Sequence, residues 1–449
     1  MNYRREIKKY VDNTFGRFGV NKKNQVARLL YEISKRDGRH FRLIAEKLPV
    51  KEGSYTFEKV KNILLKARYP DSFKKGIEKD RIYLPKLDSS SGQKADLGRG
   101  KYAPSKIYFE KDTAGSELFK NVKKVFPQAE FREIKLLKSY QKDSETGIKT
   151  YNRRRDSLFI VNEKYDFLKA CPCTAGCLCC NYVILNMGFG CPYECTYCYL
   201  QSYTNAPGIT LSANLDDFFR KVEENSEKLS GQRIGSGEFA DSLALDYIAG
   251  YSKPIIEFFK DYPDIIFEFK TKSDNIDNIL RTAPAENIVI SWSLNPPNFI
   301  RENEFYSVSL ARRLEAASKC ARAGYPVGFH FDPVVDYPGY EKDYREVVDL
   351  IFDSVNPEKI RWISVGTFRF PRGLKRTVEK RFPESQVMDG ELLIGFDGKL
   401  RYVKEKRIEI YKMMKNYIQK KSKKPYIYLC MEPVEVWKEA GLKPTWRWE

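Results

Sequence analysis

The sequence predicts an α/β protein built on a parallel sheet, open or curled toward a barrel, with a basic helical segment in front of it. Two observations lead to this fold class. Over about 200 residues beyond position 200, apolar segments typical of strands alternate with amphipathic segments typical of helices, as in parallel sheets. The first hundred residues, in contrast, show only the three- and four-residue spacing of apolar side chains that is typical of helices.

Residues 1–80 are expected to form a helical domain. The helical spacing is found in three segments, 26–36, 41–48 and 57–69, and a proline directly follows the second and the third. The third segment carries four basic residues that suit a helix-turn-helix-like nucleic-acid module: Lys59, Lys61, Lys66 and Arg68. A basic three-helix domain for docking or oligomerisation is the alternative.

Positive charge is concentrated in this part of the chain. Residues 1–100 hold 25 Lys and Arg against 12 Asp and Glu, which is +13 of the formal +19 of the 449-residue chain. Cations that neutralise phosphates release condensed counterions, so a concentrated basic segment attracts polyanions. We therefore expect a nucleic acid as partner, and a solvated basic face without a partner is the alternative.

A linker and a small α/β unit are expected next. Residues 81–104 form the linker, because this stretch is rich in Ser, Gly and charged residues. The unit at 105–180 ends in a cysteine-rich segment, and its expected elements are strands at 105–112, 129–137 and 157–164 and a helix at 116–126.

Residues 181–449 are expected to hold the main sheet and a C-terminal extension. The strand-like segments lie at 233–241, 265–272, 287–295, 327–335 and 361–368. The helix-like segments between them lie at 217–229, up to 262, and at 275–282, 309–324 and 344–355. Ligands bind at the carboxyl ends of the strands in such sheets, so polar residues that follow a strand are the candidates for chemistry.

The chain is expected to be cytoplasmic and not to enter a membrane. No run approaches the roughly 18 apolar residues of a membrane span, and the N-terminus has no apolar h-region of a secretory signal. Eight of the ten cysteines lie between positions 171 and 198. In a reducing compartment such a cluster indicates metal binding or redox chemistry and not a disulfide framework.

Cys191, Cys195 and Cys198 form a C-x3-C-x2-C motif. This short spacing gathers three thiolates around one inorganic core, and thiolates are the usual ligands of iron–sulfur clusters. Three ligands leave one iron of a four-iron cluster open to a small molecule. Zinc is disfavoured because the chain has only two histidines, but a zinc site made of four cysteine ligands stays open because more cysteines lie nearby.

The motif, with an aromatic residue before its last cysteine, resembles the radical S-adenosylmethionine (SAM) enzymes. The segments CPYECTYCYLQSY, GEFADSLALD, KTKSDNIDNIL, SWSLN and AGYPVGFHFDPVVDYPGY are similar, in this order, to the spore photoproduct lyase family. The resemblance runs from about residue 105 to near the C-terminus. It implies a radical-SAM partial (β/α) barrel and a [4Fe-4S] cluster on the three motif cysteines.

The resemblance also implies roles for six further residues. Tyr197 and Tyr199 match tyrosines beside the cluster in the region that lines SAM and relays the radical. The positions that match the SAM pocket are Glu238, Lys272, Ser293 and Asn295. The Gly235–Glu238 segment resembles the strand end that holds the SAM amino group, where a carboxylate suits an ammonium group.

The sequence departs from the family at Glu238. Spore photoproduct lyases carry a cysteine at this position, which returns a hydrogen atom to the product radical. A carboxylate cannot donate a hydrogen atom as a thiol does. Either Tyr197, Tyr199 or Cys180 replaces that donor, or the reaction differs.

The other cysteines allow two interpretations. Cys171, Cys173 and Cys177, with Cys180 or its neighbour Cys179, could hold a second metal site, either zinc or an auxiliary cluster. Alternatively, some of them are buried apolar residues or redox-active thiols. We expect the two remaining cysteines, at positions 320 and 430, to lie in the core.

The resemblance implies a lyase that repairs a UV thymine adduct in DNA, with DNA as partner and a reductant such as flavodoxin or ferredoxin. A radical SAM enzyme acting on RNA, a peptide or a metabolite is the first alternative. A non-enzymatic zinc-containing nucleic-acid-binding protein is the second. The SAM-pocket matches at Glu238, Lys272 and Ser293 argue against the second, because a zinc ribbon needs none of them.

Overall fold

The computed structural model describes residues 3–50, 55–74, 76, 79–88, 93–98, 100–142, 147–202 and 207–445. The chain divides into two compact units, which we call the basic unit (Met1–Lys94 with Phe368–Arg407) and the sheet unit (Ala95–Thr367 with Ile408–Glu449). The basic unit holds 35 Lys and Arg against 17 Asp and Glu, so it carries +18 of the chain's +19. The sheet unit is nearly neutral.

The basic unit is formed by two segments far apart in sequence. The first supplies the helices α1 (Tyr3–Thr14), α2 (Val20–Asp37), α3 (Phe41–Ala45), α4 (Phe57–Arg68) and α5 (Pro70–Lys74). The second supplies helix α17 (Arg372–Arg381) and a small antiparallel sheet of β15 (Arg369–Phe370), β17 (Leu400–Arg401) and β16 (Leu393–Ile394). The three helices expected from the sequence are present, and α1 is an additional one.

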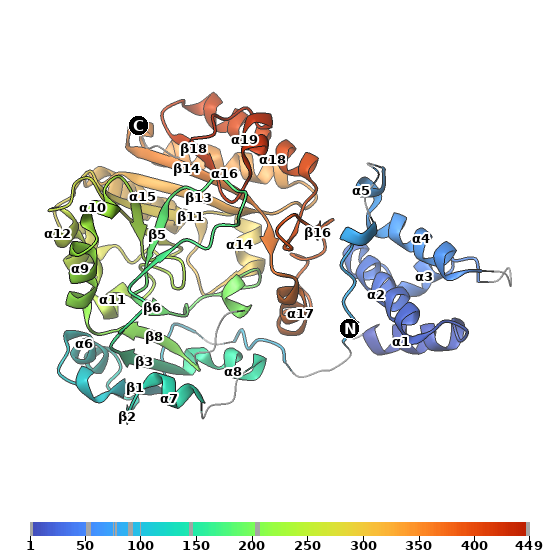
Figure 1. Cartoon of the computed structure of the whole chain (residues 1–449), viewed down its shortest axis with the longest axis horizontal. Helices are drawn as coiled ribbons and strands as arrows, with labels where there is room; N and C mark the ends of the chain where they lie inside the picture. Colours follow the sequence, from blue (N-terminus) through green and yellow to red (C-terminus); the bar gives the residue numbers. More distant parts are fainter. Residues whose placement is uncertain are drawn as a thin grey trace. The chain divides into compact units, whose positions relative to one another are not determined.

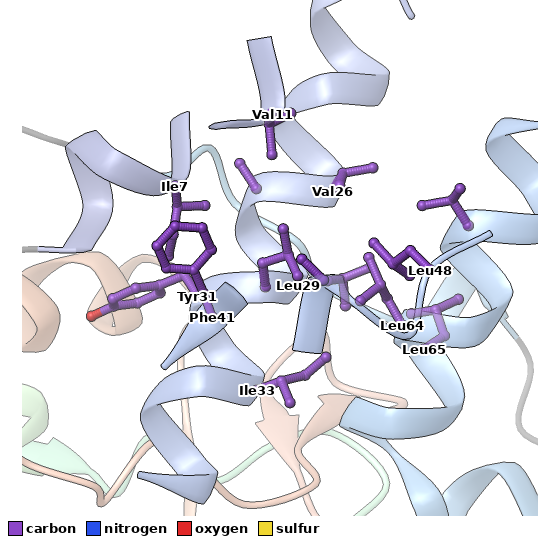
Figure 2. Packing of buried hydrophobic residues seen from close by; sticks show 14 of the residues in the cluster. Ile7, Val11, Val26, Leu29, Tyr31, Ile33, Phe41, Leu48, Leu64 and Leu65 are labelled. Carbon is purple, nitrogen blue, oxygen red and sulfur yellow. The ribbon is translucent and has the colours of Figure 1, made fainter. Parts of the chain in front are cut away.

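An apolar core joins the helices of the basic unit, and its residues lie on the inward stripes of α1, α2 and α4 (Figure 2). Ile7, Leu29 and Leu65 are fully buried, and Leu393 of the second segment belongs to the same cluster. Thr56 caps the N-terminus of helix α4, because its hydroxyl accepts a hydrogen bond from the Lys59 amide at 3.2 Å. The second segment is therefore part of the core of this unit.

Buried ion pairs tie the same two segments together. The Glu32 carboxylate contacts Arg28 at 2.6 Å, Arg68 at 2.8 Å and Lys375 at 2.7 Å, and Glu379 of α17 pairs with Arg28. Burial favours the neutral acid, but the three cations hold the pKa of Glu32 well below its usual value. Because Arg68 is used in this cluster, it does not belong to an exposed basic face as the sequence suggested.

The sheet unit is built around an eight-stranded sheet that curls into a half-barrel (Figure 1). Its strands are β4 (Leu168–Ala170), β5 (Tyr182–Leu185), β9 (Arg233–Gly235), β10 (Ile266–Thr271), β11 (Ile288–Ser293), β13 (Val327–Val334), β14 (Ile360–Thr367) and β18 (Tyr426–Leu429). From β5 to β18 neighbours are parallel and follow the order of the sequence, and β4 is antiparallel at one edge. This confirms the predicted fold class.

Helices connect the parallel strands. They are α9 (Leu215–Glu223), α10 (Ser226–Leu229), α11 (Asp246–Ala249), α12 (Ser252–Phe259), α13 (Asp277–Leu280), α14 (Pro297–Asn303), α15 (Leu310–Arg322), α16 (Tyr340–Ser354) and α18 (Lys404–Lys421). Helix α19 (Val434–Glu439) follows the last strand. Residues at every position of β11 are buried, as expected for a strand covered on both faces. Cys320 on α15 is fully buried, which confirms its predicted place in the core. Among the described helices, none is both long and apolar enough to cross a membrane.

A second sheet begins before the half-barrel in sequence. It has the order β2 (Glu130–Ile134), β1 (Lys106–Glu110), β3 (Ser157–Val161), β8 (Ile209–Ser212) and β6 (Gly188–Phe189), with helices α6 (Glu117–Val125), α7 (Leu137–Lys142) and α8 (Ile148–Asn152). The first three strands and α6 agree with the expected elements. Two further strands come from beyond residue 180, so the small sheet and the half-barrel alternate along the chain around the cysteine motif.

Candidate active site

The predicted site residues lie at the carboxyl ends of the parallel strands of the half-barrel. The cysteine motif follows β5, Glu238 lies three residues beyond β9, and Lys272 directly follows β10. Ser293 is the last residue of β11, and Asn295 lies two residues further on. Four neighbouring strands therefore position the predicted residues at their carboxyl ends, which is where parallel sheets of this kind bind ligands.

The cysteine loop is fixed by backbone contacts. Strand β7 (Glu194–Cys195) pairs with β12 (Glu304–Phe305), which places Cys195 opposite Glu304. The Cys198 amide donates to the Cys195 carbonyl at 3.1 Å and closes a turn. The Gln201 side-chain amide donates to the carbonyls of Cys195, Thr196 and Cys198 at 3.0–3.2 Å.

Arg154 supports the other end of the same loop. This buried guanidinium pairs with the Glu194 carboxylate and donates to the carbonyls of Tyr193 at 2.8 Å and Cys191 at 3.4 Å. Neither Arg154 nor Gln201 was expected from the sequence, because each contacts backbone carbonyl groups of the loop and neither is a ligand type in the cysteine motif. The contacts of both residues orient the loop, and they involve its backbone carbonyl groups and not its three thiols.

The three thiols of the cysteine motif are chemically suited to bind an iron–sulfur cluster. Cys191, Cys195 and Cys198 are each half-buried, and burial raises the pKa of all three. In the part of the chain that the structure describes, no three His, Cys, Asp or Glu side chains are close enough to hold one ion. In an iron–sulfur cluster each cysteine binds a different iron, so separate thiols on one fixed loop suit it.

Tyr197 belongs to a buried network around Glu304. Its hydroxyl donates to one carboxylate oxygen of Glu304, which also accepts from the Asn295 amide at 2.8 Å. The other oxygen pairs with Arg313 at 2.6 Å. Burial favours the neutral acid, but Arg313 and Lys272 hold the Glu304 pKa at about 2.

Asn295 is committed to this network at both ends of its side chain, because its carbonyl oxygen accepts from the Tyr344 hydroxyl at 2.8 Å. Ser293 is buried, and its backbone carbonyl accepts from Arg313 at 2.8 Å. Arg313 and Glu304 thus connect Ser293 and Asn295 to the cysteine loop. The sequence analysis identified neither Arg313 nor Glu304.

Lys272 reaches the same place from β10. Its ammonium lies 6.0 Å from the ring centre of Tyr197, and its backbone amide donates to Asp241 at 2.7 Å. Asp241 also accepts from the amides of Leu243 and Ala244 at 3.1 and 2.9 Å. This carboxylate thus holds the ends of β9 and β10 together and positions Lys272.

Tyr199 and Glu238 form a second contact beside the loop. The Tyr199 hydroxyl lies 2.7 Å from the Glu238 carboxylate and 2.6 Å from its backbone carbonyl. The Lys270 ammonium lies 3.6 Å from the other carboxylate oxygen. Burial and the neighbouring carboxylate raise the pKa of Tyr199 well above its usual value, so this phenol keeps its proton.

Deeper in the half-barrel, His330 is part of the packing. Its ring nitrogens contact Glu268 at 2.7 Å and Ser364 at 3.0 Å, and the residue is buried. Arg233 lies 3.7 Å from the same carboxylate and donates to the Tyr428 hydroxyl at 2.8 Å. These residues contact one another deeper in the half-barrel than the predicted site.

Comparisons with known proteins give a family and a fold to which this chain is similar. Residues 102–429 match the family model described as spore photoproduct lyase. A spore photoproduct lyase of Clostridium acetobutylicum is 29% identical over 48% of this chain and 66% of its own length, and one from a Geobacillus species is 25% identical over 71% and 95%. A solved spore photoproduct lyase mutant with bound AdoMet and dinucleoside spore photoproduct superposes with a TM-score of 0.63 at 24% identity, covering 73% of this chain and 99% of that one.

Proposed function

The chain belongs to the spore photoproduct lyase family of radical SAM enzymes, and we propose that it repairs a UV-induced thymine adduct in DNA. The observation that supports this proposal is the position of the C-x3-C-x2-C loop at the carboxyl ends of the half-barrel strands. The loop lies within residues 102–429, which match the family model. We propose Cys191, Cys195 and Cys198 as ligands of a [4Fe-4S] cluster. When bound, the cluster and SAM supply a deoxyadenosyl radical.

This chain's own residues would orient SAM and its products. The Lys272 ammonium, beside Tyr197, is placed to meet a carboxylate or ribose hydroxyl, and Ser293 ends the neighbouring strand. Glu238 keeps its predicted role toward the SAM amino group, in competition with its contact to Tyr199. Asn295, held at both ends, supports the pocket by fixing Glu304.

We propose Tyr199 as the residue that replaces the family's hydrogen-donating thiol. Glu238 stands at the position of that thiol, and the Tyr199 hydroxyl is hydrogen-bonded to it. The tyrosine therefore presents an O–H group where the carboxylate has none to give as a hydrogen atom. Tyr197 is less suited, because its hydroxyl is buried against Glu304.

The substrate would have to leave the DNA stack to reach this edge. Extruding a stacked step costs a few kcal/mol, and less where the step is already distorted by a cross-link. A radical SAM enzyme acting on RNA, a peptide or a metabolite is the alternative, and Glu238 is the observation that favours it. A second metal site at Cys171, Cys173, Cys177 and Cys180 stays a prediction that metal analysis tests.

Product analysis tests the proposed reaction. The protein, purified without oxygen, is incubated with SAM, a reductant and UV-irradiated dry DNA, and released deoxyadenosine and restored thymidine are measured. We expect both products, and we expect Cys195→Ser to abolish both because it removes a cluster ligand. Cys320→Ala, which changes a buried core cysteine, is the matched control. Deoxyadenosine without loss of the lesion would overturn the DNA substrate.

We further propose that the basic unit binds the DNA backbone. It carries +18, and exposed cations lie in both of its segments, among them Lys9, Lys47 and Arg376. A cytoplasmic reductant such as flavodoxin or ferredoxin is the further partner that we propose. Deleting residues 1–80 alone is a poor test of DNA binding, because Leu393 and Lys375 would lose their packing partners.

Neutralising exposed cations is the cleaner test. The triple change Lys9→Gln, Lys47→Gln and Arg376→Gln should weaken duplex binding, and each lost phosphate contact should reduce the slope of log K against log salt by ~0.9. A triple Gln change at exposed lysines of the sheet unit (Lys111, Lys123 and Lys124) is the control. Equal effects of the two triple variants would contradict the assignment to the basic unit.

A further inference from the structure

Lys270 is a charged side chain of the half-barrel that the proposed reaction does not use. It lies on β10, two residues after Glu268 and two before Lys272, and side chains two positions apart on a strand lie on the same face of the sheet. Glu268 is buried in the packing around His330, whereas Lys272 lies beside Tyr197. Lys270 therefore lies between the packed interior and the predicted SAM pocket.

Buried aromatic rings lie on the side of Lys270 that faces the packed interior. Its ammonium lies 5.8 Å from the ring centre of Tyr182. The Arg233 guanidinium lies 4.9–5.1 Å from the ring centres of Tyr182, Trp362 and Tyr428. Such rings attract a cation but carry no full negative charge. The carboxylate that pairs with Lys270 comes instead from the neighbouring strand end.

Glu238, three residues beyond β9, supplies that carboxylate. Its Oε2 lies 3.6 Å from the Lys270 Nζ, and its Oε1 accepts from the Tyr199 hydroxyl at 2.7 Å. The two segments approach closely, because a Cβ at Gly237 would lie 2.9 Å from the Cβ of Lys270. The Ser242 hydroxyl accepts from the Lys270 amide at 3.0 Å, and the Ser242 amide donates to the Lys270 carbonyl at 3.2 Å. Backbone contacts thus bring the ion pair together.

The ion pair of Lys270 and Glu238 is charged and accessible. The two side chains are 27% and 15% exposed, so a small ligand can reach them. Burial disfavours the ammonium, but Glu238 holds the pKa of Lys270 well above its usual value, so the positive charge persists. Two cations therefore compete for the carboxylate when SAM is bound. One is Lys270, which the strand holds in place, and the other is the SAM amino group, which the family resemblance assigns to Glu238.

We propose that Lys270 is a positioning residue that holds Glu238 toward Tyr199 and weakens its attraction for the SAM amino group. The proposal rests on the proposed lyase function, in which Tyr199 is the hydrogen donor. With Lys270 on one carboxylate oxygen, the other oxygen keeps the phenol in place. Without Lys270, the carboxylate can turn to the SAM amino group. Removal of this one charge should strengthen SAM binding and weaken repair, and a residue needed only for packing would not move the two in opposite directions.

Lys270→Met tests this role in the anaerobic holoprotein, because it keeps the length of the side chain and removes its charge. Titration calorimetry without reductant measures SAM affinity. Deoxyadenosine and thymidine are then measured after reduction in the presence of UV-irradiated dry DNA. We expect the Kd for SAM to fall about threefold, as for one partly exposed ion pair, and the ratio of thymidine to deoxyadenosine to fall about threefold or more.

Two further variants are the controls. Lys270→Arg keeps the positive charge and should recover both values. Lys253→Met removes an exposed lysine of α12 that pairs with its own carboxylate, Glu257, and should behave as the parent protein.

Several outcomes would overturn the proposal. Weaker or unchanged SAM binding in Lys270→Met would do so, and so would an unchanged ratio of thymidine to deoxyadenosine. Equal changes in Lys270→Met and Lys270→Arg would assign Lys270 to packing and overturn it as well. If the parent protein releases deoxyadenosine but restores no thymidine, the proposed lyase function fails. The SAM titration then decides the role of Lys270 by itself, because it needs no lesion.

Discussion

At the scale of single residues, the proposed hydrogen donor depends on the contact between Tyr199 and Glu238. The resemblance to the family places Glu238 where a thiol is expected, and the Tyr199 phenol is hydrogen-bonded to the Glu238 carboxylate at 2.7 Å. The spacing of the cysteine motif predicted that Tyr199 follows a ligand. The contact with Glu238, 39 positions away, depends on the strand ends meeting.

We predict that Tyr199→Phe separates SAM cleavage from repair. Loss of the O–H group should reduce restored thymidine about tenfold or more, while deoxyadenosine is still released because the three cysteines are untouched. Adding Glu238→Cys to this variant should recover part of the repair by supplying a thiol. Both products are measured by chromatography under single-turnover conditions.

Tyr247→Phe, at an exposed tyrosine of α11, is the matched control and should behave as the parent protein. If Tyr199→Phe restores thymidine as fast as the parent, Tyr199 is not the donor. A parallel fall of deoxyadenosine and thymidine would instead assign the phenol to binding of SAM.

At the scale of elements, Glu304 links three of them. Strand β12 pairs with the cysteine strand β7, and its carboxylate accepts from Tyr197 and pairs with Arg313 of α15. Both partners of the ion pair are fully buried. The carboxylate therefore connects the cysteine loop to a helix that covers the half-barrel.

We predict that Glu304→Gln destabilises the protein by about 3–5 kcal/mol, because it leaves a buried guanidinium without its charge partner. Anaerobic denaturation in urea measures this loss. Glu302→Gln, two positions earlier, is the control, since that carboxylate and its partner Arg301 are mostly exposed. A similar loss in both variants would contradict the role of the buried pair.

The pH dependence of the same variant follows from the Glu304 pKa, which is lowered from 4.5 to about 2. A carboxylate with a lowered pKa stabilises the fold fully above pH 4.5, and this contribution disappears as the pH falls toward 2. The stability difference between Glu304→Gln and the parent should thus stay constant from neutral pH to about 5. It should shrink below that, and a difference that grows on acidification would be the wrong sign.

At the scale of the whole molecule, the excess positive charge and the predicted active site belong to different units. The basic unit carries +18 and the sheet unit carries the cysteine loop. The basic unit depends on both of its segments, because Arg28 pairs with Glu379, 351 positions later. We therefore describe it as one folded body and not as an N-terminal extension.

We predict that Glu32→Gln loosens the basic unit selectively. The change leaves Arg28, Arg68 and Lys375 buried with one carboxylate fewer, at a cost of about 3–5 kcal/mol. Hydrogen exchange should rise in α2, α4 and α17 and stay unchanged in α15 of the sheet unit. Glu46→Gln, at an exposed position, should change neither. A rise of hydrogen exchange in α15 as large as that in α2, α4 and α17 would mean that the two units unfold together.

The sequence by itself determined what depends on local spacing. The three-residue and two-residue gaps of the cysteine motif, the alternation of strands and helices, and the excess of positive charge at the N-terminus are all read within short windows. The fold class followed from the alternation, and the family followed from the resemblance of five short sequence segments. Periodicity reports which face of an element is apolar, so elements such as β11 and α15 were expected close to where they lie.

The tertiary structure alone decided which distant side chains meet. Glu304 and Arg154 belong to no motif, yet they hold the cysteine loop, because strand pairing and buried charge act between residues far apart in the chain. The same reason explains why Arg68, expected on a basic face, lies buried beside Glu32, and why Lys375 belongs with the N-terminal helices. A buried charge needs a partner, and only the folded chain shows which partner it has.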